Sequence, residues 1–406
     1  MPGSFRRRGC TCPETQKKCT CGATWSFRLS AGKNPKTGKY DYVERNGFKT
    51  KREAELAAAK LYAELKEGTY VKENNSTFEE FSREWLSMYK ATGKVKISTV
   101  RVREHEIDKL SPYFAKLRMK DITKKRYQNA LNDLKETKGF ADNTLDGIHR
   151  TGRMIFKKAA EMDVIKIDPT QYAHVPKVQK TVEELEKEEA TVKYLEKEEL
   201  ALFLKTAKDK GLDRDYLIFK TLAYTGMRIG ELCALKWADI DFEEHTLSIS
   251  KTYYNPINKT TEYTLLTPKT KSARRTIELD VTLLEELKSY QEVQKSIQLS
   301  NLDTYHNKDF VFAKTKKNPG YPELIKVIQI RMARLLKLAD LNENLTPHSL
   351  RHTHTSLLAE AGVGLQEIMD RLGHKDDDTT KHVYLHVTKP KKKEASQKFS
   401  ELMESL

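Results

Sequence analysis

The hydrophobic periodicity of this chain changes twice along its length, and these changes set its domain organisation. Apolar and polar residues alternate at the strand period near the start, apolar residues recur at helical spacing from residue 77, and both patterns occur after residue 194. A chain of 406 residues is also longer than one hydrophobic core usually supports. The sequence therefore predicts a multidomain protein: a small α+β domain, an all-α domain, and a mixed, mainly α domain with a small antiparallel sheet.

The first domain is expected to be a three-stranded sheet with one helix behind it. Strand patterns at 25–29 and 40–43 flank a turn-forming Asn-Pro-Lys-Thr-Gly segment. Thr50 and Glu53 have the spacing of a capping box and precede an Ala-, Leu- and Glu-rich helix. A domain this small has a marginal core, so a further stabilising device is expected.

Composition marks the remaining boundaries. Asp-Pro and Val-Pro pairs close the helical domain, and a charged segment follows as a linker. The predicted parts are 1–70, the helical domain 76–175, the linker 176–193, the mainly α domain 194–390 and a C-terminal helix 391–406. That last helix has an apolar stripe, so it is expected to dock either in a groove of a neighbouring copy or on its own domain.

Charge points to a polyanionic partner. Lys and Arg number 73 against 58 Asp and Glu, a net charge of +15, and the first 52 residues hold 13 basic and three acidic side chains. No stretch approaches the roughly 18 consecutive apolar residues of a membrane span. The basic start is not followed by the apolar region of a secretory signal. We therefore expect a cytoplasmic, nucleic-acid-binding protein with no membrane partner.

Four of the five cysteines fall within one short segment, as Cys10, Cys12, Cys19 and Cys21. Four thiolates paired in this way suit tetrahedral zinc, which would tie down a short strand end. The alternative is four thiols in a flexible loop. The fifth, Cys233, sits in an apolar helical stretch and is predicted to be a buried small hydrophobe.

The first candidate for a functional site is the segment 224–232, whose sequence is Tyr-Thr-Gly-Met-Arg-Ile-Gly-Glu-Leu. Gly226 can end one helix in the left-handed conformation, and Glu231 suits the first turn of the next. Arg228 is then expected at a helix N-terminus, where anions bind well. The plainer alternative is a solvent-facing arginine paired with Glu231.

The segment 346–354 is the second candidate. Thr346 is a good N-cap, and Pro347 suits the first helical position, so the helix is predicted to begin there. His348 and Arg351 would then share one face of the first turn, which suits a phosphate. His348 and His352 have the spacing of a zinc pair, but no Glu follows His348 and no third ligand is evident.

Two further segments are less specific by themselves. Tyr384 follows His374 by ten residues, and a phenol attacks poorly unless cations stabilise the developing charge. The basic segment 267–275 bridges two predicted strands, and a lysine at such a hairpin tip can donate a proton to a DNA backbone. Taken alone, a tyrosine at such a position is usually structural. A basic turn taken alone usually makes only nonspecific contacts with phosphates.

Together these motifs resemble the tyrosine recombinase (phage integrase) family, of the kind carried by temperate phages and integrative conjugative elements. The residues that match, in the family's order, are Arg228, Lys269, His348, Arg351, His374 and Tyr384. Residues 1–70 resemble an arm-site DNA-binding domain, and 76–175 a SAM-like core-binding domain. The cysteine array is a departure, because the family's usual arm-binding fold does not need it.

The resemblance implies a site-specific DNA recombinase of a mobile element that works through a 3′-phosphotyrosyl intermediate, without metal or nucleotide. Tyr384 would be the nucleophile, and Arg228 and Arg351 would clamp the non-bridging phosphate oxygens. Lys269 would protonate the leaving 5′-oxygen, with Lys271 as its rival.

In the same family pattern, His348 and His374 would position the phosphate and help move the tyrosine proton. The implied partners are double-stranded DNA with core and arm attachment sites, further copies of the chain in a tetramer, a small directionality factor and a host DNA-bending protein, all at the nucleoid. Two alternatives are a chromosome-dimer resolving recombinase, which generally lacks such a basic arm domain, and a catalytically silent DNA-binding protein, which would have no reason to keep Tyr384.

Overall fold

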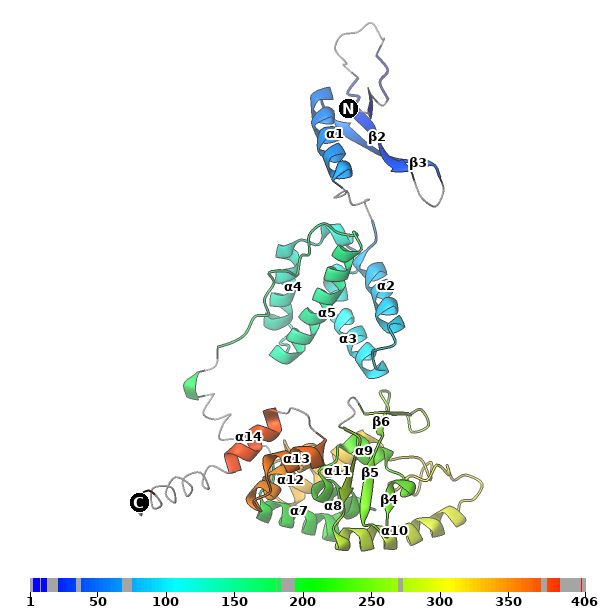
Figure 1. Ribbon diagram of the computed structural model, residues 1–406, viewed down its shortest axis with the longest axis vertical. Coiled ribbons are helices and arrows are strands. Elements are labelled where there is room, and N and C mark those ends of the chain that lie inside the picture. Colours follow the sequence, from blue (N-terminus) through cyan, green and yellow to red (C-terminus); the bar gives the residue numbers. More distant parts are fainter. Residues whose placement is uncertain are drawn as a thin grey trace. The chain divides into compact units, whose positions relative to one another are not determined.

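Two compact units make up the chain, Met1–Gln179 and Lys180–Leu406, and each is described by itself (Figure 1). The computed structural model describes residues 3–7, 9–12, 21–33, 38–67, 75–179, 181–183, 194–268, 273–373, 378–387 and 403. Within these residues, no helix combines the length and the hydropathy that a membrane crossing requires.

The N-terminal domain is an antiparallel sheet with a helix packed against it, as predicted. Its elements are β1 (Gly3–Arg7), β2 (Trp25–Lys33), β3 (Tyr40–Phe48) and α1 (Lys51–Lys66), with strand order β1-β2-β3. The capping box of Thr50 and Glu53 is present at the start of α1. Phe27 and Leu29 of β2 are buried against Ala58 and neighbouring residues of α1. The core is small because the alternation of β2 supplies few apolar side chains to one face.

The rest of the first unit is a helical domain. Its helices are α2 (Phe78–Ala91), α3 (Ile97–Phe114), α4 (Lys124–Glu136) and α5 (Asp142–Glu161), with a 3₁₀ turn, η1, at Met119–Asp121. Phe78, Phe114, Tyr127 and Phe156 form a chain of ring contacts at its centre. The helical spacing of the apolar residues thus produced the predicted all-α core.

The second unit is mainly α with small sheets. Its elements are α7 (Lys197–Lys210), α8 (Asp215–Thr225), α9 (Ile229–Ala234), η2 (Trp237–Asp239), β4 (Ile240–Asp241), β5 (Thr246–Ile249), β6 (Thr252–Tyr254), β7 (Thr264–Leu266), β8 (Arg275–Glu278), α10 (Val281–Leu299), α11 (Ile325–Leu338), α12 (Ser349–Glu360), α13 (Leu365–Leu372) and α14 (Asp378–Val387). A continuous core joins α7, α8, α10, α11 and the sheet β4-β5-β8. Cys233 is buried in this core, as predicted, and burial raises the pKa of its thiol.

Strand pairing differs from the sequence-based expectation. β7 pairs with β6 and β8 pairs with β5, so the segment 267–274 joins two sheets and is not the tip of a hairpin between paired strands. Tyr253 of β6 stacks at 5.6 Å on Tyr263, which immediately precedes β7, so this ring contact supports the pairing of β6 with β7. Lys269 and Lys271 lie outside the described residues.

The start of α12 also differs. The helix begins at Ser349 with His348 as N-cap, and not at Pro347 with Thr346 as N-cap. The reason is local: the Ser349 amide donates to the Thr346 carbonyl at 2.7 Å, and the Thr346 amide donates to Ser349 Oγ at 3.1 Å. These two bonds close a turn before the helix proper begins.

Candidate active site

Arg228 stands at the junction of two helices, as predicted. Gly226 ends α8 in the left-handed conformation, with φ +62°, and Arg228 is the N-cap of α9. Its backbone N–H donates to Glu231 Oε2 at 2.9 Å, and its guanidinium pairs with Oε1 of the same side chain at 3.0 Å. The side chain is 38% exposed. Arg228 therefore lies at a helix N-terminus and pairs with Glu231, and its side chain remains accessible.

Glu231 is shared with a second arginine that the sequence did not single out. Arg275, from β8, forms an ion pair with Glu231 at 3.0 Å, and both side chains are buried. Burial acts to raise the pKa of Glu231, but the ion pairs with Arg275 and Arg228 outweigh it, and the pKa lies below its usual value. A buried carboxylate thus fixes the positions of two guanidinium groups.

Arg351 connects three segments of the site. It is almost fully buried, at 1% exposure, and donates from Nη1 to the Gly226 carbonyl at 2.7 Å and from Nη2 to the Leu372 carbonyl at 2.6 Å. Gly226 lies two residues before Arg228, and Leu372 two residues before His374. One guanidinium therefore holds together the chain segments that carry three of the predicted catalytic residues.

His348 lies at the start of α12 and is exposed, whereas Arg351, one turn later, is buried. The Arg351 amide donates to the His348 carbonyl at 3.1 Å. The rings of His348 and His352 meet nearly perpendicularly, 4.9 Å apart. Among the described residues, no third potential ligand joins this pair in a metal-binding group.

His354 is a site residue that the sequence analysis missed. It is buried, its Nδ1 contacts the Ala223 carbonyl at 2.8 Å, and Arg371 Nε donates to its Nε2 at 3.1 Å. Since Nε2 accepts, Nδ1 carries the proton and donates to Ala223. Burial, with a further contribution from Arg371, lowers the pKa of His354 to about 4. Its position one turn after Arg351 was a weak signal, since helical spacing alone does not distinguish a positioning histidine from a core one.

Tyr384 lies on α14, which packs against α12 and α13. Its ring is half-buried and contacts the apolar cluster of Ala359, Ile368 and Leu372. Leu372 belongs to this cluster, and its backbone carbonyl accepts a hydrogen bond from Arg351, so the cluster against which Tyr384 packs is joined to the buried arginine. His374 lies outside the described residues.

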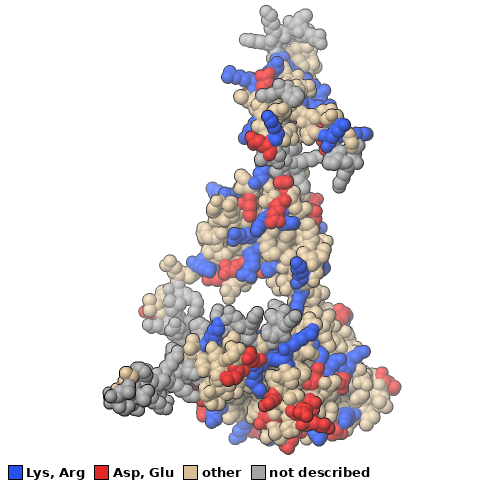
Figure 2. Space-filling view, viewed as in Figure 1, with Lys and Arg blue, Asp and Glu red and all other residues tan. Residues whose placement is uncertain are grey.

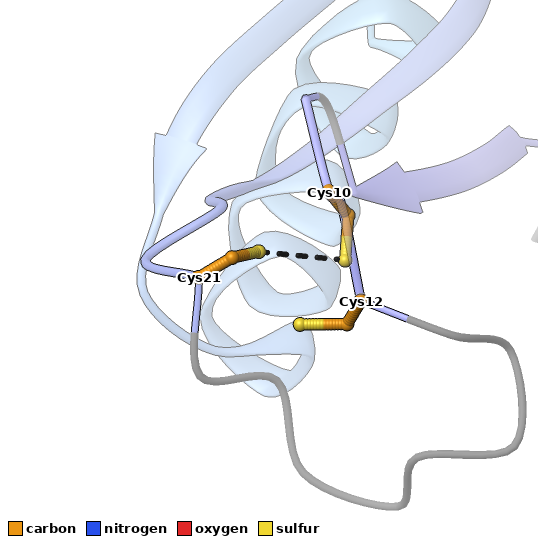
Figure 3. Close-up of side chains that lie close together, drawn as sticks. All are labelled: Cys10, Cys12 and Cys21. Carbon is orange, nitrogen blue, oxygen red and sulfur yellow. Dashed lines mark hydrogen bonds between the residues drawn. The ribbon is translucent and has the colours of Figure 1, made fainter.

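The N-terminal cysteines are brought together far from these residues in the sequence. The Sγ atoms of Cys10, Cys12 and Cys21 all lie within 4.8 Å of one another (Figure 3). Cys19 lies outside the described residues. The spacing in the sequence predicts one cluster of cysteines, and the three described ones form it.

The fold is that of DNA recombinases of known structure. The Tn1549 transposon integrase, solved in complex with transposon right end DNA, superposes with a TM-score of 0.61 at 22% identity over 76% of this chain and 95% of that one. The lambda integrase tetramer bound to a Holliday junction gives 0.57 at 18% identity over 89% of this chain and 92% of that one.

Sequence comparisons define the family. Residues 193–391 match the phage integrase family, 77–135 the SAM-like N-terminal domain of phage integrases, and 15–65 an arm DNA-binding domain. The integrase of Staphylococcus phage L54a is 30% identical over 80% of this chain and 93% of its own length. The ICEBs1 integrase of Bacillus subtilis is 27% identical over 92% of this chain and 96% of its own length. The chain belongs to the phage integrase family and is a tyrosine recombinase.

Replacing Gly226 with alanine should disable the site. A Cβ there would lie 2.6 Å from His354 Cδ2 and 2.7 Å from Leu372 Cδ2, in a left-handed backbone conformation that disfavours alanine. We expect Gly226→Ala to cost roughly 2–4 kcal/mol of stability and to abolish DNA cleavage. Gly93→Ala is the matched control, because Gly93 has φ +64° with open space around it. Equal losses of stability in the two variants, in denaturant titrations, would contradict the packing argument.

The buried His354 should make stability depend on pH. Its pKa of about 4 in the folded chain lies below the usual 6.5, so between these values the unfolded chain binds the additional proton. The contribution of neutral His354 to the free energy of unfolding is fully present above about pH 6.5. The free energy of unfolding should fall by roughly 3 kcal/mol as the pH drops to about 4. His354→Gln, which keeps a donor and an acceptor, should flatten this part of the profile in thermal melts. An unchanged slope in that variant would refute the assignment.

Proposed function

We propose that this chain is the integrase of a mobile element, and that it recombines DNA attachment sites through a 3′-phosphotyrosyl intermediate. The observation that carries the proposal is the position of Arg351, which bonds the turn before Arg228 and the residue two before His374. A site organised around one guanidinium in this way suits a reaction in which charge builds on phosphate oxygens.

In the proposed reaction, Tyr384 Oη attacks the scissile phosphorus. The new bond joins the tyrosyl oxygen to the 3′-phosphate, and the bond from phosphorus to the 5′-oxygen breaks. Arg228, accessible and pre-positioned by Glu231, would bind a non-bridging oxygen. Arg351 would bind the other. The same steps in reverse, with the 5′-hydroxyl of another strand, reseal the backbone.

Proton transfer completes the scheme. The leaving 5′-oxygen takes a proton from Lys269, with Lys271 as the alternative donor. His348, exposed at the start of α12, and His374 would position the phosphate and accept the tyrosine proton. The step balances without metal or nucleotide, because the phosphotyrosyl bond conserves the energy of the phosphodiester.

We infer that the substrate is double-stranded DNA with core and arm sites, bound by a tetramer of this chain. The relatives support this inference: the Tn1549 integrase was solved with transposon right end DNA and the lambda integrase as a tetramer on a Holliday junction. On the face shown in Figure 2, Lys and Arg side chains lie on every domain, with acidic side chains among them. Phosphate contacts from several domains make binding weaken steeply with salt.

A small directionality factor and a host DNA-bending protein are proposed as further partners, since arm and core sites must be brought together. The setting would be the cytoplasm, at the nucleoid. The C-terminal helix at 391–406, proposed to dock on a neighbouring copy, lies outside the described residues except for Met403. Dimer resolution and silent DNA binding remain the competing hypotheses for the experiment that follows.

Covalent capture tests the proposal directly. A nicked suicide duplex spanning the junction of the element that encodes the chain, mixed with full-length protein in EDTA, should give an SDS-resistant adduct. Tyr384→Phe should give none, while Tyr216→Phe, which removes a hydroxyl that donates to Glu286, should react as the wild type does. An adduct in Tyr384→Phe, or DNA binding by wild type without any adduct, would reject the mechanism.

A further inference from the structure

The connection between β1 and β2 is unusually long for two adjacent antiparallel strands. β1 ends at Arg7 and β2 begins at Trp25, and these two residues are paired in register. Hairpin loops usually have about two to five residues, and much longer ones carry a function or a stabilising device. Ser26 Oγ donates to the Arg6 carbonyl at 3.0 Å, so the strands are held together at the base of this connection.

We propose that Cys10, Cys12, Cys19 and Cys21 bind one structural zinc ion that closes this connection. Two of the cysteines follow β1 and two precede β2, as a Cys-x-Cys pair on each side. Four thiolates make a closed tetrahedral site with no open position, which is the form of structural and not of catalytic zinc.

The sulfur spacing supports a metal. Cys10 Sγ and Cys21 Sγ are 3.6 Å apart (Figure 3). A tetrahedral zinc with bonds of about 2.3 Å places its sulfurs about 3.8 Å from one another, whereas a disulfide requires about 2.05 Å. Cys12 Sγ lies within 4.8 Å of both. The described cysteines thus have the separation of shared ligands, and the sequence supplies the fourth ligand two residues before Cys21.

The surroundings of the cysteines are basic. The first 52 residues carry 13 basic and three acidic side chains. The Arg7 guanidinium lies over the ring of Trp25 at 4.9 Å and Lys51 at 6.0 Å, so positive charge is held at the base of the connection. Zinc with four thiolates is a dianion, which this basic domain compensates.

The small domain gives the ion a physical purpose. Its buried core consists of Phe27, Leu29, Leu61 and two alanines, and β1 is mostly exposed. Because metal binding contributes directly to folding, one zinc site can supply stability that so small a core lacks. The ion would hold β1 on the sheet.

The metal content of the purified protein tests the zinc proposal. Full-length chain purified without chelator should contain one zinc per chain by elemental mass spectrometry. The Cys10→Ser/Cys21→Ser double variant should contain none, and Cys233→Ala, whose thiol lies in the other unit, should keep its zinc. Cobalt exchanged into the site should give the visible absorption of tetrahedral thiolate coordination. Wild type without zinc, zinc retained in the double variant, or disulfides among these cysteines would overturn the proposal.

Hydrogen exchange provides a readout that is independent of recombination. Removing zinc from the full-length chain should speed amide exchange in β1 and β2 while leaving α8 and α12 unchanged. Exchange that is unaffected in the strands would refute the structural role. This result does not depend on DNA cleavage, so a failure of the zinc proposal and a failure of the proposed function can be told apart.

Discussion

The buried guanidinium of Arg351 is the interaction on which the catalytic unit depends. A fully desolvated positive charge is costly unless its donors are satisfied, and two of its N–H groups are directed at backbone carbonyls that end neighbouring segments. These bonds join the end of α8, the first turn of α12 and the end of α13. Removing the charge would leave those carbonyls without their donors, so the arrangement of these three segments depends on this side chain.

Close packing around this arginine leaves little freedom. Gly226 has His354 and Leu372 within contact distance of the missing Cβ, and His354 is held between Ala223 and Arg371. Because His354 is neutral and buried, it adds hydrogen bonds without adding another positive charge to a site that is already rich in arginine. Glu231 also limits the net positive charge of the site, since its carboxylate compensates the charges of Arg228 and Arg275. The positive charges of Arg228 and Arg275 are thus compensated by a buried carboxylate that also holds them in position.

Stability is distributed unevenly between the domains. The catalytic unit and the helical domain each have an extended apolar core, whereas the arm sheet has only a few buried side chains among its described residues. A domain of that size gains more from a cross-link than from improved packing. A zinc site there is consistent with the departure of this chain from the plainer arm-domain pattern.

The sequence by itself determined the elements and the chemistry: helical and strand periodicities, the Thr50 capping box, the Gly226 helix end, and the order of the catalytic motifs are all local. Tertiary structure decided which distant segments meet. The pairing of β7 with β6, the ion pair of Arg275 with Glu231 and the placement of His354 all depend on contacts between residues far apart in the chain. Local patterns specify how a segment folds, whereas burial and charge compensation across the whole unit determine which segments pair and pack with one another.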